Sequence, residues 1–131
     1  MTHISAMLLV SAGGALGAGA RYGVSLALMN YAARFPFATL TVNILGSFLL
    51  GLLFAYSQQQ SVAESWRLFL GVGVLGAFTT FSTFSVEVVA MLTQGEINKA
   101  LLHAGLNVIL CIAAVALAVV LMNSLLNISV K

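Results

Sequence analysis

The stretch Gly76-Ala-Phe-Thr-Thr-Phe-Ser-Thr-Phe-Ser85 lies in the middle of a hydrophobic segment that is long enough to cross a membrane. It carries five hydroxyl side chains and three phenylalanines. The bilayer core offers no hydrogen bonds, so each polar group at that depth needs a partner in protein or in a water-filled path. Glycines weaken a helix, and threonine hydroxyls can bond to backbone carbonyls and bend it. The stretch therefore predicts a transmembrane helix that is broken near residues 76–80.

The composition of the whole chain is that of an integral membrane protein. Of the 131 residues, 61% are hydrophobic and 6% are charged, whereas soluble domains have about 25% charged residues. A spanning helix needs about 20 mostly apolar residues, and segments of this kind fit at roughly 4–29, 38–57, 66–93 and 99–126. The connections are short, so neighbouring helices should be antiparallel. We expect one all-α membrane domain over residues 1–131, with four transmembrane helices, the third broken near its centre.

The same composition excludes several classes of function. No room remains for a soluble domain, and we find no Ser/His/Asp set, no paired carboxylates and no phosphate-binding loop, so we expect no enzyme. The single cysteine, Cys111, has no intrachain disulfide partner and no metal-ligand spacing around it. The net charge of +2 comes from few residues and forms no basic stripe, which argues against nucleic-acid binding.

The distribution of basic residues leaves the orientation in the membrane open. One side holds Arg67 and Lys131, and the other holds Arg21, Arg34 and Lys99. Such a small difference gives little bias by the positive-inside rule. The chain either inserts both ways or takes one orientation set by Arg21 and Arg34. Insertion both ways would permit an antiparallel homodimer with a two-fold axis in the membrane plane.

The first segment is rich in small residues and contains one arginine. Gly13 with Gly17, and Gly19 with Gly23, form small-xxx-small faces that allow helices to approach closely. Arg21 within a span is costly unless it reaches the interface or meets a partner. We expect Arg21 to lie near the membrane boundary and to fix the helix end.

Polar residues spaced by four share one helix face in two other segments. These are Thr39, Asn43 and Ser47 in the second segment and His103, Asn107 and Cys111 in the fourth. A membrane asparagine such as Asn43 either joins helices or offers its NH2 donors to a passing anion. His103 lies near the end of its segment, where water can solvate it, whereas Asn107 lies deeper. Polar faces on three helices are what a lined path requires, and such a path is easier to build between subunits than inside one small bundle.

The third segment adds two aromatic rings and one acid beyond the break. Phe81 and Phe84 project to similar sides, and a phenyl ring has a positive edge. Two ring edges would suit a small anion without holding it too tightly to pass, or both rings pack against neighbouring helices. Glu87 is the only carboxylate away from the loops. It accepts hydrogen bonds from Thr83, reaches water at a pore mouth, or carries a proton.

The motifs Thr39-x-x-x-Asn43-x-x-Gly46, Gly73-x-x-Gly76-x-Phe-Thr-Thr-Phe-Ser-Thr-Phe-Ser85-x-Glu87 and Gly17-Ala18-x-x-Arg21 together resemble those of the Fluc/CrcB family of bacterial fluoride channels. The resemblance covers essentially the whole chain. It implies a dual-topology homodimer of antiparallel subunits in the bacterial inner (plasma) membrane, in contact with membrane lipid. Such a dimer has two parallel paths through which fluoride passively leaves the cytoplasm.

The resemblance also implies roles for individual residues. Phe81 and Phe84 correspond to aromatic residues whose ring edges contact the ion, and Asn43 corresponds to a pore-lining amide donor. The polar track along which fluoride continues corresponds to Thr39, Ser82, Thr83 and Glu87. The backbone carbonyls of Gly76 and Thr79 correspond to ligands of a structural sodium ion (Na+) at the dimer interface.

The fourth segment departs from the family pattern. We place Asn107 and Cys111 on the fluoride path, although the family often has an aromatic residue or histidine at the first position and serine or glycine at the second. A thiol is a weaker hydrogen-bond donor than a hydroxyl, so we expect conduction to persist at an altered rate.

Two other functions compete with a channel. A small four-helix, proton-coupled drug exporter needs a central carboxylate, which in that family sits in helix one. Helix one has none here, and Glu87 is the only substitute. A non-transporting membrane subunit would use the glycine faces of the first segment for assembly, but this function leaves the hydroxyl-rich stretch unexplained.

Overall fold

The computed structural model describes residues 1–32 and 34–129, and every regular element in this part is a helix. Lys131, which entered the charge comparison, lies outside the described residues. Four helical segments are long and apolar enough to cross a membrane. They are α1 (His3–Ala27), α2 (Phe37–Gln59), the interrupted segment Glu64–Thr93 and α6 (Ile97–Ser129). A short 3-10 helix, η1 (Met29–Tyr31), lies between α1 and α2. This architecture confirms the predicted all-α membrane fold.

The helix ends differ from the expected bounds by a few residues. Thr2 caps α1, because its side chain accepts a hydrogen bond from the Ser5 N–H at 3.3 Å. The helix ends at Ala27 instead of residue 29, and α6 continues to Ser129 instead of ending at residue 126.

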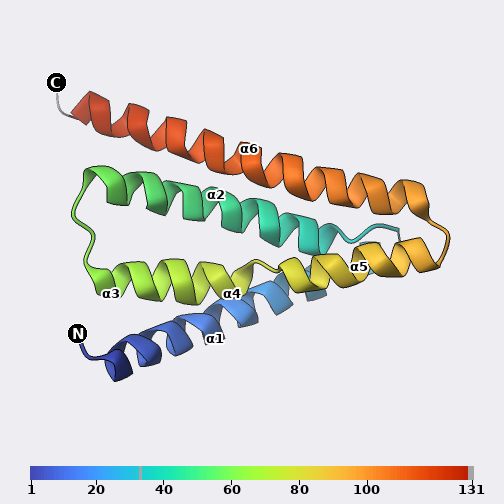
Figure 1. Cartoon of the computed structure of the whole chain (residues 1–131), viewed down its shortest axis with the longest axis horizontal. Coiled ribbons are helices and arrows are strands. Elements are labelled where there is room, and N and C mark those ends of the chain that lie inside the picture. Colours follow the sequence, from blue (N-terminus) through green and yellow to red (C-terminus); the bar gives the residue numbers. More distant parts are fainter. Residues whose placement is uncertain (33, 130–131) are drawn as a thin grey trace.

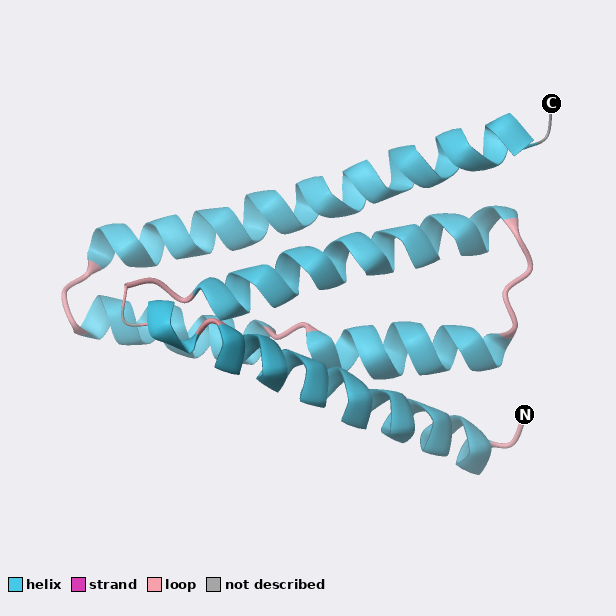
Figure 2. Ribbon diagram, turned by 180° about the vertical axis from the view of Figure 1, so that it is seen from behind, coloured by secondary structure: helices cyan, strands magenta, loops and turns pink. Residues whose placement is uncertain are grey.

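The third segment is interrupted halfway along its length, as Figure 2 shows. It comprises α3 (Glu64–Trp66), the π-helix η2 (Arg67–Leu75), α4 (Gly76–Phe78) and α5 (Phe81–Thr93). Thr79 (φ −79°, ψ 158°) and Thr80 (φ −151°, ψ 117°) have extended backbones between α4 and α5. Thr80 then caps α5, because its Oγ1 accepts from the Thr83 N–H at 3.1 Å. The predicted break is confirmed, whereas the π-helix before it was not predicted.

A tight turn joins α5 to α6. Gly95 has a φ of +77°, a conformation that residues with a Cβ rarely adopt. The Glu96 N–H donates to the Met91 carbonyl at 2.8 Å, and the Gly95 N–H donates to the Leu92 carbonyl at 3.1 Å. These two bonds form a Schellman motif, which ends α5 cleanly and lets α6 turn back along it.

The helices form two packed pairs, which are α1 with the first half of the interrupted segment (η2 and α4) and α2 with α6. The second half of the interrupted segment, α5, contacts α6 and so joins the two pairs. The four segments converge beyond the break and fan apart toward the end that carries both termini (Figure 1). A groove of about 1040 Å³ opens between α2 and η2 on that wide side, lined by residues such as Leu50, Phe54 and Val72.

Close packing of α1 on η2 depends on two of its glycines. A Cβ added to Gly13 would collide with the Phe69 carbonyl oxygen, and one added to Gly17 would collide with the Val74 carbonyl oxygen. The predicted Gly13–Gly17 packing face is therefore confirmed. Gly19 and Gly23 make no such contact within one subunit, because nothing lies within 4 Å of a Cβ added at either position.

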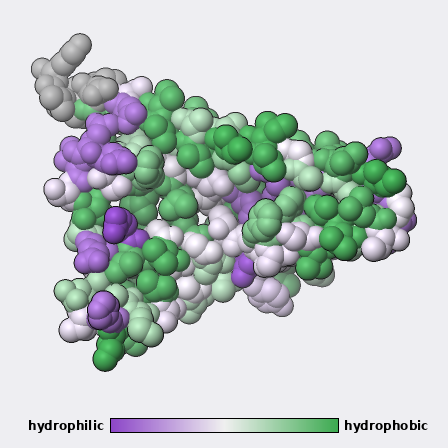
Figure 3. Space-filling model, viewed as in Figure 1, coloured by the Kyte–Doolittle hydropathy of each residue, from purple (hydrophilic) through white to green (hydrophobic). Residues whose placement is uncertain are grey.

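The exterior has the character of a membrane protein. Hydrophobic residues cover most of the visible face, and hydrophilic residues gather at the two ends of the molecule (Figure 3). A small hydrophilic area also appears near mid-length. Polar groups at that depth need partners in protein or water.

Candidate functional site: a polar track at the helix break

The centre of the site is a paired contact between Asn43 on α2 and Thr80 at the break. The Thr80 N–H donates to Asn43 Oδ1 at 2.8 Å, and Asn43 Nδ2 donates to the Thr80 carbonyl at 3.1 Å. A break in a transmembrane helix leaves backbone groups without helical partners, each costing several kcal/mol in lipid. The Asn43 amide therefore stabilises the break.

The same break removes the helical donors of backbone carbonyls on its N-terminal side, including those of Gly76 and Thr79. In a continuous helix the Thr80 N–H would donate to the Gly76 carbonyl, but here it donates to Asn43. The Thr83 N–H would donate to the Thr79 carbonyl, but here it donates to Thr80 Oγ1. Gly76 and Thr79 are the positions whose carbonyls, by the family resemblance, correspond to ligands of a structural sodium ion.

A line of side-chain hydrogen bonds extends from Asn43 across three helices. Asn43 Nδ2 donates to Asn107 Oδ1 on α6 at 2.9 Å. Asn107 Nδ2 lies 3.2 Å from His103 Nδ1 and also donates to the His103 carbonyl at 3.1 Å. His103 Nε2 lies 3.1 Å from Glu87 Oε2 on α5. Thr39 Oγ1 on α2 completes the line by donating to Glu87 Oε1 at 2.7 Å.

This network corrects two expectations from the sequence. His103 is not solvated at the interface: its side chain is fully buried, with an exposed fraction of 0%. Glu87 accepts hydrogen bonds from Thr39 and His103, and not from Thr83. The shared helix face of His103 and Asn107 was the available signal, but the position of His103 near the end of its segment obscured it.

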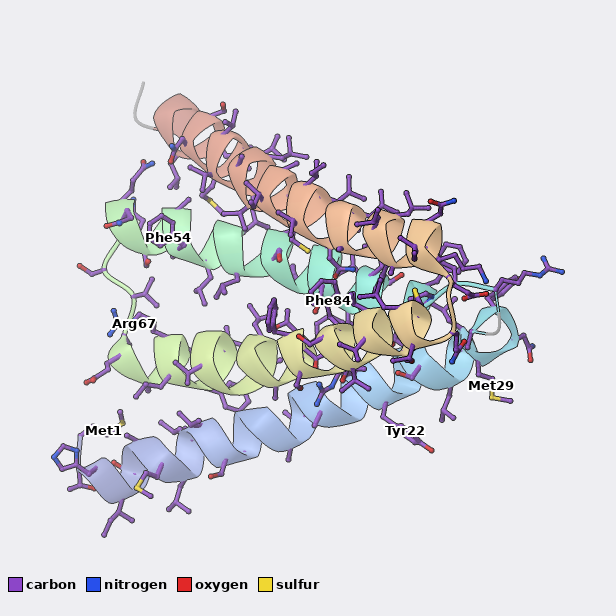
Figure 4. All side chains as sticks on the ribbon, turned by 45° about the vertical axis from the view of Figure 1, so that its right-hand side comes forward. Met1, Tyr22, Met29, Phe54, Arg67 and Phe84 are labelled. Carbon is purple, nitrogen blue, oxygen red and sulfur yellow. The ribbon has the colours of Figure 1, made fainter. Side chains whose placement is uncertain are left out.

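Aromatic rings surround the buried imidazole. The Phe84 ring centroid lies 5.2 Å from that of His103 and 5.3 Å from that of Phe81. Phe35, which the sequence analysis missed, meets His103 edge-on at 5.3 Å. Phe84, labelled in Figure 4, is buried where α5 faces α2 and α6. Phe81 is 78% exposed on the surface of the subunit. The two rings are neighbours, as expected, but only Phe84 is enclosed by its own chain.

A pocket of about 380 Å³ lies at the break. Five of the predicted fluoride-path residues line it: Asn43, Phe81, Phe84, Asn107 and Cys111. Thr79 and Thr80 line it as well, so the pocket has apolar walls with hydroxyl, amide and thiol groups set into them. Such a mixture fits a small ligand that needs a few well-placed polar contacts.

Two further pockets lie nearby and have overlapping lining residues. Thr80 also lines a pocket of about 240 Å³, together with Arg21, Thr39 and Thr83. Thr39 and Thr83 in turn line a third pocket of about 470 Å³, which includes Glu87. Thr80 therefore lies between the first two pockets, and Thr39 and Thr83 are shared by the last two, of which the third includes Glu87.

Arg21 and the hydroxyls around the 240 Å³ pocket favour an anion there. Arg21, which we expected only to fix a helix end, lines the 240 Å³ pocket beside Thr39 and Thr83. Thr83 Oγ1 accepts from Thr80 Oγ1 at 3.0 Å, so its own proton remains available to an anion. Ser82 is exposed, with its hydroxyl 3.3 Å from Thr80 Oγ1. Among the described residues, no group of three His, Cys, Asp or Glu side chains is placed to hold a metal ion.

The fold and the site define a multi-pass membrane protein with a polar track at the depth of the bilayer. The family model described as "CrcB-like protein, Camphor Resistance (CrcB)" matches residues 8–119, and the chain belongs to this family. The resemblance seen in the sequence motifs is therefore confirmed.

Curated relatives extend over nearly the whole chain. A protein of Idiomarina loihiensis named "Fluoride-specific ion channel FluC" is 64% identical over 116 residues, covering 88% of this chain and 90% of that protein. A protein of the same name from Shewanella amazonensis is 49% identical over 112 residues, covering 85% and 90%. Another from Saccharophagus degradans is 46% identical over 125 residues, covering 95% and 94%.

Proposed function

We propose that the protein is a passive, fluoride-selective ion channel of the bacterial inner membrane. The observation that carries the proposal is a set of three pockets with overlapping linings, which include Asn43, Phe84, Thr39, Thr83 and Glu87. The names and the similarity of the relatives support fluoride as the ion.

The chemistry of the track suits this ion. Fluoride is small and strongly hydrated, so many donors at close range must replace its water. Both amide hydrogens of Asn43 are bonded within the chain, to the Thr80 carbonyl and to Asn107 Oδ1. A fluoride ion at Asn43 would take the place of one of these two acceptors. Exchange of one acceptor for another favours entry without excessive binding, as conduction requires.

A second copy of the chain, inserted the opposite way, would complete the path. The exposed ring of Phe81 and the exposed hydroxyls of Ser82 and Thr83 lie at bilayer depth. Polar groups in that position need protein or water around them. An antiparallel partner packed on this face would enclose them and give two parallel paths per dimer.

A structural sodium ion would fit the break. The Gly76 and Thr79 carbonyls have lost their helical donors to Asn43 and Thr80 Oγ1, and unwound backbone carbonyls are suitable ligands for sodium. Two carbonyls from each subunit would hold the ion at the dimer interface. Its positive charge would stabilise carbonyls that lipid cannot satisfy.

The drug-exporter alternative has less support. It needs a carboxylate that exchanges protons freely with a central cavity, whereas Glu87 is held by Thr39 and His103. α1 contains no Asp or Glu. Nothing in the family or the site supports catalysis.

Growth of a bacterium that lacks its own fluoride exporter tests the proposal in cells. Expression of the protein should restore growth in fluoride at mildly acidic external pH, where HF enters and releases fluoride inside. A drug exporter would protect against cationic drugs and leave fluoride sensitivity unchanged. Protection against drugs alone would overturn the proposal.

A further inference from the structure

His103 has contacts that the proposed path does not explain. It is fully buried, so it does not line the path as Thr39, Thr83 and Glu87 do. Yet both ring nitrogens have polar partners on different helices: Nδ1 faces Asn107, and Nε2 faces Glu87. A buried imidazole with two directional partners holds those partners in fixed orientations.

The directions of the hydrogen bonds from Thr80 through Asn43, Asn107 and His103 to Glu87 follow from one backbone group. The Thr80 N–H can only donate, so Asn43 must turn its Oδ1 toward Thr80. Asn43 Nδ2 then donates to Asn107 Oδ1, which leaves Asn107 Nδ2 facing the imidazole. His103 Nδ1 must therefore accept, and its one proton lies on Nε2, directed at Glu87 Oε2.

The far end of the line is a carboxylate on the proposed anion path. Glu87 lines the 470 Å³ pocket with Thr39 and Thr83, and its side chain is 26% exposed. A free carboxylate in this position would repel an anion and compete with it for hydroxyl donors. Thr39 engages Oε1 and His103 engages Oε2, so both oxygens are held by protein donors.

We propose that His103 is a positioning residue for anion passage: its Nε2–H restrains the Glu87 carboxylate so that the negative charge does not obstruct the track. This inference rests on the proposed function. It adds that the break at Thr80 and the carboxylate at Glu87 are linked through Asn43, Asn107 and His103.

Fluoride efflux from liposomes tests the inference with matched variants. His103→Leu should slow efflux about tenfold or more, the size expected for losing a hydrogen bond to a charged group. His103→Gln should recover most of the rate, because a glutamine amide can still donate from the position of Nε2. His3→Leu changes the other histidine, which is exposed at the start of α1, and should match the unmodified protein.

The same His103 substitution in a Glu87→Gln protein distinguishes a positioning role of His103 from a general structural role. On a Glu87→Gln background, which removes the charge, His103→Leu should change efflux by less than about twofold, because interacting residues are not additive. An equal loss with and without the Glu87 charge would contradict the inference, as would normal efflux in His103→Leu. Absence of fluoride efflux from the folded, unmodified dimer would instead reject the proposed function.

The tautomer of His103 provides a test of the inference that requires no measurement of flux. The His3→Leu variant contains a single histidine, so its imidazole nitrogen NMR signals belong to His103 alone. We expect a proton on Nε2 and none on Nδ1 in the folded protein at neutral pH. Protonated Nδ1 with bare Nε2 would overturn the inference even if the His103 or Glu87 variants fail to fold or conduct.

Discussion

Asn43 and Thr80 are bound to each other through two hydrogen bonds, one in each direction. Asn43 Oδ1 accepts from the Thr80 N–H at 2.8 Å, and Asn43 Nδ2 donates to the Thr80 carbonyl at 3.1 Å. A side-chain amide thus takes the place of helical backbone partners. This relationship explains how a helix can break halfway through a bilayer without leaving the Thr80 backbone unsatisfied.

Replacing Asn43 should therefore destabilise the fold as well as the path. Asn43→Leu leaves the Thr80 N–H without its acceptor, at about 1–3 kcal/mol for a buried unsatisfied donor. We expect a clearly lower unfolding midpoint in detergent, together with reduced fluoride flux. Ser47→Ala, one turn along the same helix face, is the control and should unfold near the midpoint of the unmodified protein. Equal midpoints for Asn43→Leu and Ser47→Ala would refute the capping role.

Substitutions of Phe81 and Phe84 should differ in their effects on stability but have similar effects on fluoride flux. Phe84 is buried against His103, and Phe81 is exposed on the isolated subunit. Phe84→Ile should lower subunit stability by about 1 kcal/mol or more, whereas Phe81→Ile should not. Both should reduce fluoride efflux while the dimer remains assembled, as judged by size-exclusion chromatography and liposome flux. Normal efflux in both variants would exclude a role for the ring edges.

Glycines at two positions should respond differently to alanine. A Cβ at Gly17 would collide with the Val74 carbonyl oxygen, whereas a Cβ at Gly76 would meet only the Gly71 carbonyl oxygen, at 3.6 Å. Gly76 also has an ordinary helical φ of −63°. Gly17→Ala should disrupt the packing of α1 on η2 and lower the unfolding midpoint.

Gly76→Ala should leave the subunit folded. Its effects should be limited to assembly of the dimer and binding of the cation. A weaker dimer in Gly76→Ala, with loss of any stabilisation of the dimer by sodium over potassium, would support the proposed sodium site. Unchanged dimer stability and flux would count against it.

The single cysteine offers a chemical probe of the pocket. Cys111 is partly exposed and lines the 380 Å³ pocket beside Asn43 and Phe84. A thiol reagent that is small enough to enter the pocket and to modify Cys111 should slow fluoride efflux roughly several-fold, because the added group narrows the pore. Cys111→Ser should conduct and resist the reagent. Inhibition of both proteins to the same extent would place the reaction elsewhere.

The sequence alone predicted the features that depend on residues close together in the chain. Apolar length predicted the four spans, and the glycines and threonines of residues 76–80 predicted the break. The spacing of four placed Asn43 with Thr39 and Asn107 with His103 on shared faces. The bonds of Thr39 to Glu87 and of Asn43 to Asn107 then follow from how those faces meet in the fold.

Features that depend on the relative position of helices could not be predicted. The burial of His103 results from the packing of α5 and Phe35 around the start of α6, which no spacing reveals. The open surroundings of Gly19 and Gly23 likewise depend on which face of α1 meets η2. Residues at i and i+3, such as Phe81 and Phe84, share a side of a helix but need not share its burial.

Anion efflux from liposomes that contain the purified protein tests the central claim most directly. Fluoride and chloride release should be compared under the same gradient, with a proton ionophore absent and present. A passive fluoride channel predicts fast fluoride efflux, negligible chloride efflux and no requirement for a pH gradient. Comparable chloride efflux, strict dependence on a proton gradient, or no fluoride efflux from well-folded dimers would contradict it.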